Sequence, residues 1–186
     1  MEFLKMMGAL KMLTEFLCIA ILNLGLPNAN FACEYMETVV EAANTNDIRA
    51  ELIVAMIYYE SRWTPTARSK SNACGLMQVI PKYSGNRKKG IKNYTCKQLF
   101  NPITNIAVGT ELLSRWVNKK YGHLKRGEAM GVCAYFAGYG GRCASRKPRK
   151  AGMRYSNKVR KLANRIKKEV NEAQKEHDLV KLDYSY

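Results

Sequence analysis

The 186-residue sequence is poor in acidic residues and in histidine, and it lacks the cysteine spacings of a zinc site. Asp and Glu number 15 against 31 Lys and Arg, which gives a formal charge of +16, and there are only 2 His. The 6 cysteines include no Cys-x-x-Cys pair and have no His at zinc-ligand spacing, so we expect no metal and no cofactor. Beyond residue 40 no apolar run approaches the roughly 20 residues of a membrane-spanning helix, and no repeat recurs at a fixed period. These absences exclude zinc modules, solenoids and polytopic membrane proteins.

The residues that are present suit one folded domain, because 47% of them are hydrophobic. Apolar residues recur with helical spacing in four stretches, over 48–60, 105–121, 127–137 and 159–173. Between residues 64 and 101 the chain is rich in Ser, Asn, Lys, Gly and Pro, which predicts loops with a short strand or one helical turn. We expect a mostly α domain with a loop-rich segment after its first helix, a basic amphipathic last helix, and fraying over 176–186.

Residues 1–32 form a separate apolar segment in front of this domain. Lys5 and Lys11 precede a dense apolar stretch that ends in small residues, which is typical of a secretory signal peptide. A membrane anchor is the alternative, and lipid attachment at Cys33 is a further one. Export to the periplasm or the extracellular space permits disulfides. Cys18 would then leave with the signal peptide, and Cys33 would be the odd thiol.

Glu60 shares a helical stripe with apolar side chains. Ile53, Ile57 and Glu60 are spaced i, i+4 and i+7, and the oxygens of residues 44–47 could cap the start of this helix. A carboxylate near a helix C-terminus is disfavoured by the helix dipole, so its presence there favours a functional role. The sequence therefore predicts an acid that faces the core side at the end of the first helix.

Five short motifs follow one another along the chain. They are Glu60-Ser61, Ala67-x-Ser69, Ala73-x-Gly75-Leu76-Met77-Gln78, Leu99-Phe100-Asn101-Pro102 with Asn105-Ile106-x-x-Gly109, and Ala134-Tyr135-x-Ala137-Gly138. In this order and spacing the chain resembles the soluble lytic transglycosylases, a lysozyme-like family of peptidoglycan-cleaving enzymes. The resemblance implies a lysozyme-like transglycosylase domain over 33–170 and a polar tail over 171–186. It is closest to the small exported type found in bacteriophages and beside bacterial secretion and conjugation systems.

The resemblance implies a reaction that needs one carboxylate. Glu60 would protonate the glycosidic oxygen between N-acetylmuramic acid and N-acetylglucosamine, and would then act as base on the muramyl 6-hydroxyl. That hydroxyl attacks the anomeric carbon and leaves a 1,6-anhydro end, so the second acid that most glycosidases use is not needed. An apolar setting would keep Glu60 protonated near neutral pH. We interpret Glu111 and Glu128 as surface charges of helices.

The same resemblance assigns substrate contacts to residues of three motifs. They are Ser69, Met77, Gln78, Ile80, Tyr135 and Phe136. Ser69 would bind an acetamido group, Gln78 would line the cleft beside the acid, and the hydroxyl of Tyr135 would orient that acid. Phe136 stands where the family usually has asparagine, so a cleft hydrogen bond is expected to be lost.

Four of the cysteines lie beside these motifs. Local pairing predicts two disulfides, Cys74–Cys96 and Cys133–Cys143, each of which would close a flexible loop next to the cleft.

The positive charge favours polyanionic partners. We expect a monomer that acts on peptidoglycan glycan strands and meets anionic polymers of the cell envelope. Nucleic acid is disfavoured because zinc-finger spacing and RNA-recognition motifs are absent. Three alternatives stay open: a lysozyme-type hydrolase, a wall-binding pseudo-enzyme on the same fold, and a non-enzymatic cationic protein.

Overall fold

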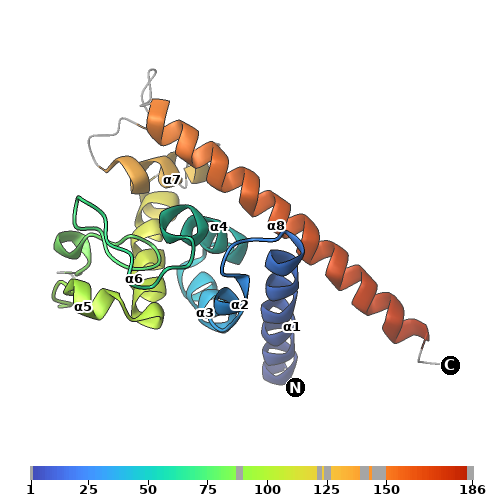
Figure 1. The fold of residues 1–186 in the computed structure, drawn as a ribbon. Coiled ribbons are helices and arrows are strands. Elements are labelled where there is room, and N and C mark those ends of the chain that lie inside the picture. Colours follow the sequence, from blue (N-terminus) through green and yellow to red (C-terminus); the bar gives the residue numbers. More distant parts are fainter. Residues whose placement is uncertain are drawn as a thin grey trace.

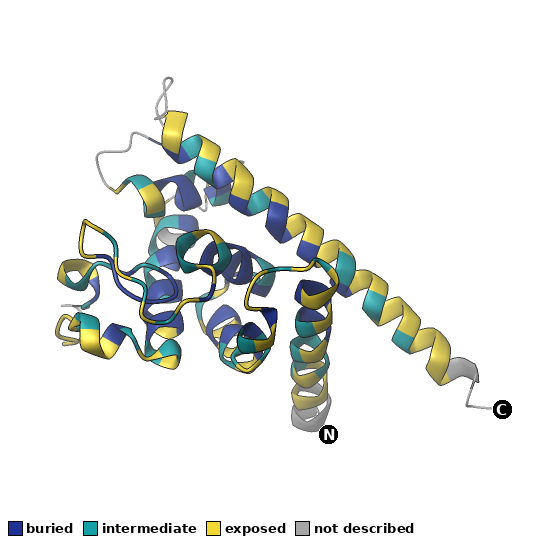
Figure 2. Ribbon diagram, viewed as in Figure 1, coloured by how far each residue is buried: buried dark blue, intermediate teal, exposed yellow. Residues whose placement is uncertain are grey.

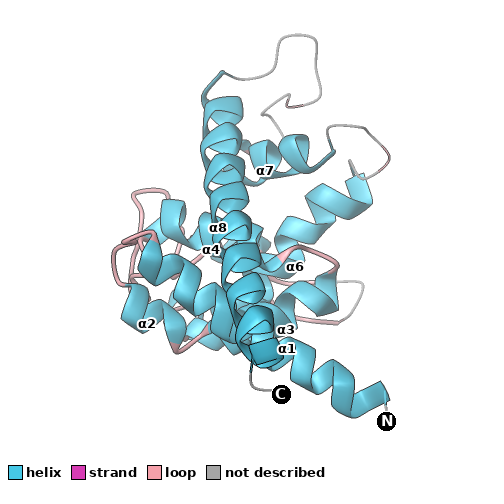
Figure 3. Cartoon of the chain, turned by 90° about the vertical axis from the view of Figure 1, so that its right-hand side faces the viewer, coloured by secondary structure: helices cyan, strands magenta, loops and turns pink. Residues whose placement is uncertain are grey.

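The fold is built from helices and loops, as the apolar spacing predicted (Figure 1, Figure 3). The computed structural model describes residues 2–86, 90–120, 123, 127–138, 143 and 150–183. The helices are α1 (Glu2–Asn23), α2 (Ala29–Cys33), α3 (Met36–Asn46), α4 (Ala50–Ser61), α5 (Cys96–Leu99), α6 (Pro102–Ser114), α7 (Gly127–Ala137) and α8 (Lys150–Asp183). A 3-10 turn, η1 (Pro81–Tyr83), and a π-helical segment, η3 (Arg115–Lys120), complete the set. Extended pairing in the described part of the chain consists of isolated bridges.

Helix α4 lies at the centre of the core. Its residues 52–57 are all buried, so the helix is apolar around its whole circumference rather than along one stripe (Figure 2). Helices α3 and α8 pack against it. The helix that carries Glu60 is therefore fixed by contacts on several sides.

The N-terminal end of α4 differs from our expectation. Residues 44–46 form the last turn of α3, and Asp47 ends that helix in the left-handed conformation with a φ of 52°. The side chain of Asn46 donates a hydrogen bond to the Ala42 carbonyl at 2.9 Å, within its own helix. Polar residues between two helices suit the end of the first as well as the start of the second, so the predicted cap was wrong.

The segment between α4 and α6 is loop-rich, as predicted, and side-chain caps fix where its following helices begin. Thr95 and Gln98 form a reciprocal capping box at the start of α5. Asn101 caps α6 by accepting a hydrogen bond from the amide of Thr104, and Pro102 occupies the first helical position. These caps position α6 behind the loop that carries Met77 and Gln78.

Helix α8 is the longest element, and its 34 residues extend over about 51 Å. One stripe of the helix is buried, made by Val159, Leu162, Ala163, Ile166 and Val170. Its last turns extend past the rest of the molecule (Figure 1). The helix continues to Asp183, so the expected fraying from residue 176 does not occur over the described residues.

The N-terminal segment is packed and cross-linked in this structure. Helix α1 contacts α8 and α3, and it buries Phe16, Leu17, Ala20 and Ile21. Cys18 and Cys33 form a disulfide, so the prediction that Cys33 is the odd thiol was wrong. Its partner, Cys18, lies in the segment that we expected to be cleaved as a signal peptide. Among the described helices, none is both long enough and apolar enough to cross a membrane. Cleavage of residues 1–32 stays a prediction.

Candidate active site

Glu60 lies in the last turn of α4, where the chain turns sharply into the loop. Arg62 and Trp63 follow with φ values of 51° and 60°, and they end the helix. The hydroxyl of Tyr155 donates a hydrogen bond to Oε1 of Glu60 at 2.5 Å. Burial raises the pKa of Glu60 to about 7, and the hydrogen bond from Tyr155 opposes this rise. The carboxyl group can therefore hold a proton near neutral pH and release it there.

Tyr155 was not among the residues expected at the site. It lies on α8, four residues before Val159, and thus extends the buried stripe of that helix toward α4. The ring of Phe136 stacks on it with centroids 4.6 Å apart and planes at 18°. Because Phe136 is 51% exposed, it covers Tyr155 from the solvent side. The aromatic ring in place of asparagine thus supports the group that holds Glu60.

Tyr135 makes a different contact from the one expected. Its hydroxyl donates to the main-chain carbonyl of Met77 at 2.8 Å, whereas the hydrogen bond to Glu60 comes from Tyr155. Burial raises the pKa of Tyr135 well above its usual value, and the nearby charge of Glu60 adds to this shift. Tyr135 therefore lies close to the acid and joins α7 to the loop after α4.

Asn105 holds that loop from beneath. Its Oδ1 accepts a hydrogen bond from the amide of Met77 at 2.7 Å, and its Nδ2 donates to the carbonyls of Cys74 at 2.9 Å and Leu99 at 2.7 Å. Gly75 has a φ of 77°, and a Cβ there would lie 2.1 Å from Nδ2 of Asn105. Glycine is thus required for the close approach of loop and α6. Gly75 and Asn105, from two of the motifs, thus act together to hold the loop against α6.

The neighbouring residues Met77 and Gln78 place their side chains in different surroundings. The side chain of Met77 is fully buried, and a Cβ on Gly109 would lie 2.5 Å from its sulfur. Met77 therefore supports the loop from the core, and a substrate contact by this residue stays a prediction. Gln78 has a φ of 49° and donates through Nε2 to the carbonyls of Ala67 at 3.1 Å and Gly75 at 3.0 Å.

A cleft of about 1020 Å³ extends from this loop to α7. Its lining includes Gln78, Ile80, Lys82, Tyr83, Tyr135 and Phe136. Four of the expected contact residues are in this group. Tyr135 and Phe136 connect the cleft with the Glu60–Tyr155 pair. Ser69 lies in the loop after α4, where its hydroxyl accepts from the amide of Ala73 at 3.1 Å and contacts the hydroxyl of Ser71 at 3.0 Å.

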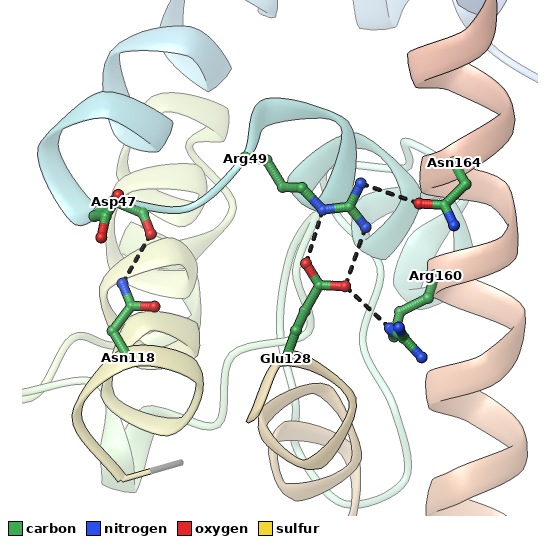
Figure 4. Close-up of polar contacts among 6 residues, drawn as sticks. All are labelled: Asp47, Arg49, Asn118, Glu128, Arg160 and Asn164. Carbon is green, nitrogen blue, oxygen red and sulfur yellow. Dashed lines mark hydrogen bonds and ion pairs between the residues drawn. The ribbon is translucent and has the colours of Figure 1, made fainter. Parts of the chain in front are cut away.

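The two other candidate acids are engaged in ion pairs. Arg49 binds both oxygens of Glu128, at 2.7 and 3.1 Å, and Arg160 binds one of them at 3.0 Å (Figure 4). Burial alone would raise the pKa of Glu128, but these hydrogen bonds and charges lower it below its usual value. Glu111 pairs with Arg115 at 3.3 Å and accepts from Asn86 at 2.9 Å. Both acids are less exposed than surface charges would be.

The residues that line the cleft in the described part of the chain include no Asp or Glu, and Glu60 adjoins the cleft through Tyr155 and Phe136 rather than lining it. The sequence of the remaining internal segments, 87–89, 121–122, 124–126, 139–142 and 144–149, contains no Asp or Glu. Within the described residues, no three His, Cys, Asp or Glu side chains gather in a way that could hold a metal ion. The site thus presents a single carboxyl group.

Both predicted disulfides are present in the structure. Cys74 pairs with Cys96, which ties the loop to the start of α5, and Cys133 on α7 pairs with Cys143. They join the two walls of the cleft to neighbouring segments. Each wall is therefore fixed by a covalent link as well as by hydrogen bonds.

Fold and site together define a helical enzyme-like domain in which one protonatable carboxyl group adjoins a cleft. The family model described as the transglycosylase SLT domain matches residues 37–158, and the chain belongs to this family.

Individual relatives agree with this assignment. The chain is 35% identical over 100 residues to membrane-bound lytic murein transglycosylase E of Buchnera aphidicola, which covers 50% of this chain and 44% of that protein. It is 37% identical over 105 residues to a putative soluble lytic murein transglycosylase of Haemophilus influenzae, covering 54% of this chain and 16% of the relative. The chain thus spans less than half the length of these relatives.

A solved structure is also similar. It is the X-ray structure of an inactive glutamate-to-glutamine mutant of the lytic transglycosylase Slt from Pseudomonas aeruginosa. The TM-score is 0.64 at 26% sequence identity, and the match covers 78% of this chain and 25% of that one. The likeness supports the lysozyme-like helical fold expected from the motifs.

Proposed function

We propose that this protein is a peptidoglycan lytic transglycosylase. It would cleave the β-1,4 bond between N-acetylmuramic acid and N-acetylglucosamine and leave 1,6-anhydromuramyl ends. The observation that carries the proposal is the single carboxyl group beside the cleft, held by a neutral hydroxyl, with a pKa raised to about 7. A water-using glycosidase normally needs a second carboxylate, which the described walls of this cleft do not supply.

The reaction would proceed in two proton transfers at Glu60. First, the protonated carboxyl group donates its proton to the glycosidic oxygen as the bond to the anomeric carbon breaks. Tyr155 is bonded to Oε1, so Oε2 is the oxygen available to the substrate. The carboxylate then accepts the proton of the muramyl 6-hydroxyl as that oxygen attacks the anomeric carbon. Glu60 ends protonated, and no water is consumed.

The surrounding residues would bind and orient the glycan. Gln78, Ile80, Tyr135 and Phe136 line the cleft and would contact the sugar rings. Ser69 would bind an acetamido group from the loop after α4. Two observations support these roles: Phe136 of the cleft stacks on Tyr155, which is bonded to Glu60, and the similar Slt structure is of an inactive mutant in which glutamine replaced a glutamate.

We propose further that the protein works in the cell envelope after export. Three disulfides suit an oxidising compartment, and the relatives compared above bear the names of murein transglycosylases, one of them membrane-bound. Peptidoglycan strands would be the substrate, and the high positive charge would favour contact with the anionic polymers around them.

Mass spectrometry of digested murein tests this proposal. Purified sacculi would be incubated with the protein and with a Glu60→Gln variant, and the soluble products compared. The proposal expects anhydromuramyl ends from the unaltered protein and none from the variant. Reducing muramyl ends would identify a hydrolase instead, and products that persist with Glu60→Gln would remove Glu60 from the reaction.

A further inference from the structure

Helix α8 carries a single row of cations on the face opposite the core. The row consists of Lys150, Arg154, Lys158, Lys161, Arg165 and Lys168, and every one of these residues is exposed. The spacings of three and four residues place them on one side of the helix over about 27 Å. In Figure 2 the outer side of α8 is exposed while its inner side is buried, and in Figure 3 the helix lies in front of the other described helices. The row thus faces solvent along its whole length.

The row has little compensation within the protein. The sequence from 150 to 168 contains no Asp or Glu, and like charges three and four positions apart repel each other. Arg160 pairs with Glu128, but it lies on a different side of the helix, and Lys168 pairs with Glu172 where the row ends. None of the ion pairs among the described residues involves the five cations from Lys150 to Arg165 of the row. An anionic partner from outside would relieve this repulsion.

The row lies on the same rigid helix as the residue that holds Glu60. Arg154 directly precedes Tyr155, whose hydroxyl is bonded to the acid. Phe136, which lines the cleft, stacks on Tyr155 with ring centroids 4.6 Å apart, so this helix also contacts the cleft wall. One continuous helix therefore carries both the cation row and a contact to the cleft wall.

We infer that this row is a docking surface for the carboxylate-bearing stem peptides of peptidoglycan outside the cleft. The inference rests on the proposed function, because the polymer cut at Glu60 is the one whose peptides would lie along α8. Lysine, which provides four of the six cations, pairs with carboxylates as a mobile point charge. Two contacts on one polymer raise its effective concentration at the cleft. The row would thus lower KM for polymeric murein.

The composition of this face disfavours two other polyanions. Its exposed neighbours are Ala151, Asn157 and Asn164. None of these exposed α8 residues has an aromatic ring on which a nucleic-acid base could stack or a large apolar side chain to insert into a bilayer. A purely electrostatic row suits an array of carboxylates held in water.

Binding to insoluble murein tests the inference independently of catalysis. All proteins would carry Glu60→Gln, so that no substrate is consumed. The test variant adds Lys158→Gln, Lys161→Gln and Arg165→Gln, and the matched control adds Lys70→Gln, Lys92→Gln and Lys97→Gln, which remove the same charge from exposed loop and α5 positions. Affinities would be measured for intact sacculi and for glycan strands stripped of peptides by an amidase. Because each exposed ion pair is weak, we expect the three substitutions together to weaken binding to sacculi about tenfold.

The controls separate the stem peptides from other partners. The control variant should bind sacculi within threefold of its parent, and stripped glycan should bind all three proteins equally. Equal losses in both triple variants would reduce the effect to net charge and overturn the inference, as would unchanged binding by the test variant. Tighter binding of the parent to duplex DNA or to phosphatidylglycerol vesicles than to sacculi would assign the face to another partner.

A kinetic measurement completes the test. In the protein with Glu60 intact, the three α8 substitutions should raise KM for sacculi about tenfold and leave cleavage of short peptide-free glycans unchanged. An equal loss on both substrates would contradict docking. If the unaltered protein cuts neither substrate, the proposed function fails, while the binding measurements still decide whether the row recognises stem peptides.

Discussion

The C-terminal end of α4 and the start of α7 each hold a partly buried glutamate, and the two acids have opposite properties. Glu60 receives one hydrogen bond from a neutral tyrosine, and burial raises its pKa to about 7. Glu128 is clamped by Arg49 and Arg160, which lower its pKa although burial acts in the other direction. Burial raises the pKa of both acids, and the two arginines reverse that rise at Glu128, so of these two acids Glu60 is the one that can donate a proton near neutral pH.

Substitutions at the two sites should therefore have different consequences. Loss of Glu60 should affect chemistry, and loss of the clamp on Glu128 should affect the free energy of unfolding. If a substitution at Glu60 mainly lowered the free energy of unfolding, or a substitution around Glu128 mainly lowered turnover, the two acids would not have these different roles.

The largest expected effect is on turnover by Glu60→Gln. Glutamine has nearly the same shape but cannot give and retake a proton, so the rate on purified murein should fall by at least about 10²–10⁴. The folded-state pKa of Glu60 is raised, so its burial costs stability as pH increases through about 7. The variant should therefore melt at the same or a higher temperature than the unaltered protein at pH 8. Turnover above a tenth of the original would show that another group is the acid.

Next in size is a loss of stability in Arg49→Met. Removing the bidentate partner leaves Glu128 with Arg160 alone, which should lower the free energy of unfolding by about 1–2 kcal/mol at pH 7. Because the folded-state pKa of Glu128 is lowered, this contribution exists above its unfolded pKa and is lost as pH falls through the folded value. Urea unfolding at pH 7 and pH 3 measures the difference.

Arg49→Lys is the matched control, since it keeps the charge but not the forked geometry. It should lose less stability than Arg49→Met. Turnover of both variants should stay within threefold of the original. A turnover loss without a stability loss would place Glu128 in the reaction.

A smaller effect on rate, with a distinctive pH signature, is expected for Tyr155→Phe. The hydroxyl lowers the pKa of Glu60, so its removal should shift the alkaline limb of kcat/KM to higher pH. The lost hydrogen bond should also reduce the rate about tenfold. A pH–rate profile from pH 5 to 9 measures both. Tyr135→Phe serves as the comparison, because its hydroxyl is bonded to Met77, and an identical shift there would contradict the assignment of Tyr155.

The smallest effect should come from Phe136→Asn. The ring is half-exposed and stacks on Tyr155, a contact that contributes about 0.5–1.5 kcal/mol. We expect a stability loss within that range, and turnover within a few-fold of the original, by thermal melting and murein digestion. A collapse of both would mean that Phe136 is a core residue.

Sequence patterns predicted the elements whose signal is local. The helix of Glu60, the loops after it and the two local disulfides follow from apolar spacing, glycine content and cysteine proximity. The caps were harder, because residues 44–47 can end one helix or begin another. The C-terminal helix was predicted at the right place but with too few residues. Its final turns extend past the domain and lack an apolar stripe, so the apolar spacing did not indicate them.

The features that the sequence did not predict depend on contacts between segments that are far apart in the chain. Tyr155 is 95 residues from Glu60, and nothing nearby in the sequence marks it as the partner of the acid. Its position four residues before Val159 was the available signal. Cys18 was set aside with the N-terminal segment, so its disulfide with Cys33 could not be foreseen. Tyr135 was placed near the acid, but its hydrogen-bond partner depends on packing.

Titration of the glutamate side chains measures directly whether Glu60 and Glu128 differ in pKa as described above. Carbon-13 resonances of the Glu carboxyl groups would be followed by NMR from pH 3 to 9, and assigned with Glu60→Gln and Glu128→Gln spectra. We expect Glu60 to titrate at about pH 7 and Glu128 to titrate below 4.5, the ordinary value for glutamate. A Glu60 resonance that titrates at 4.5 or lower would contradict this expectation, since such a group would be ionised at neutral pH and could not donate the proton.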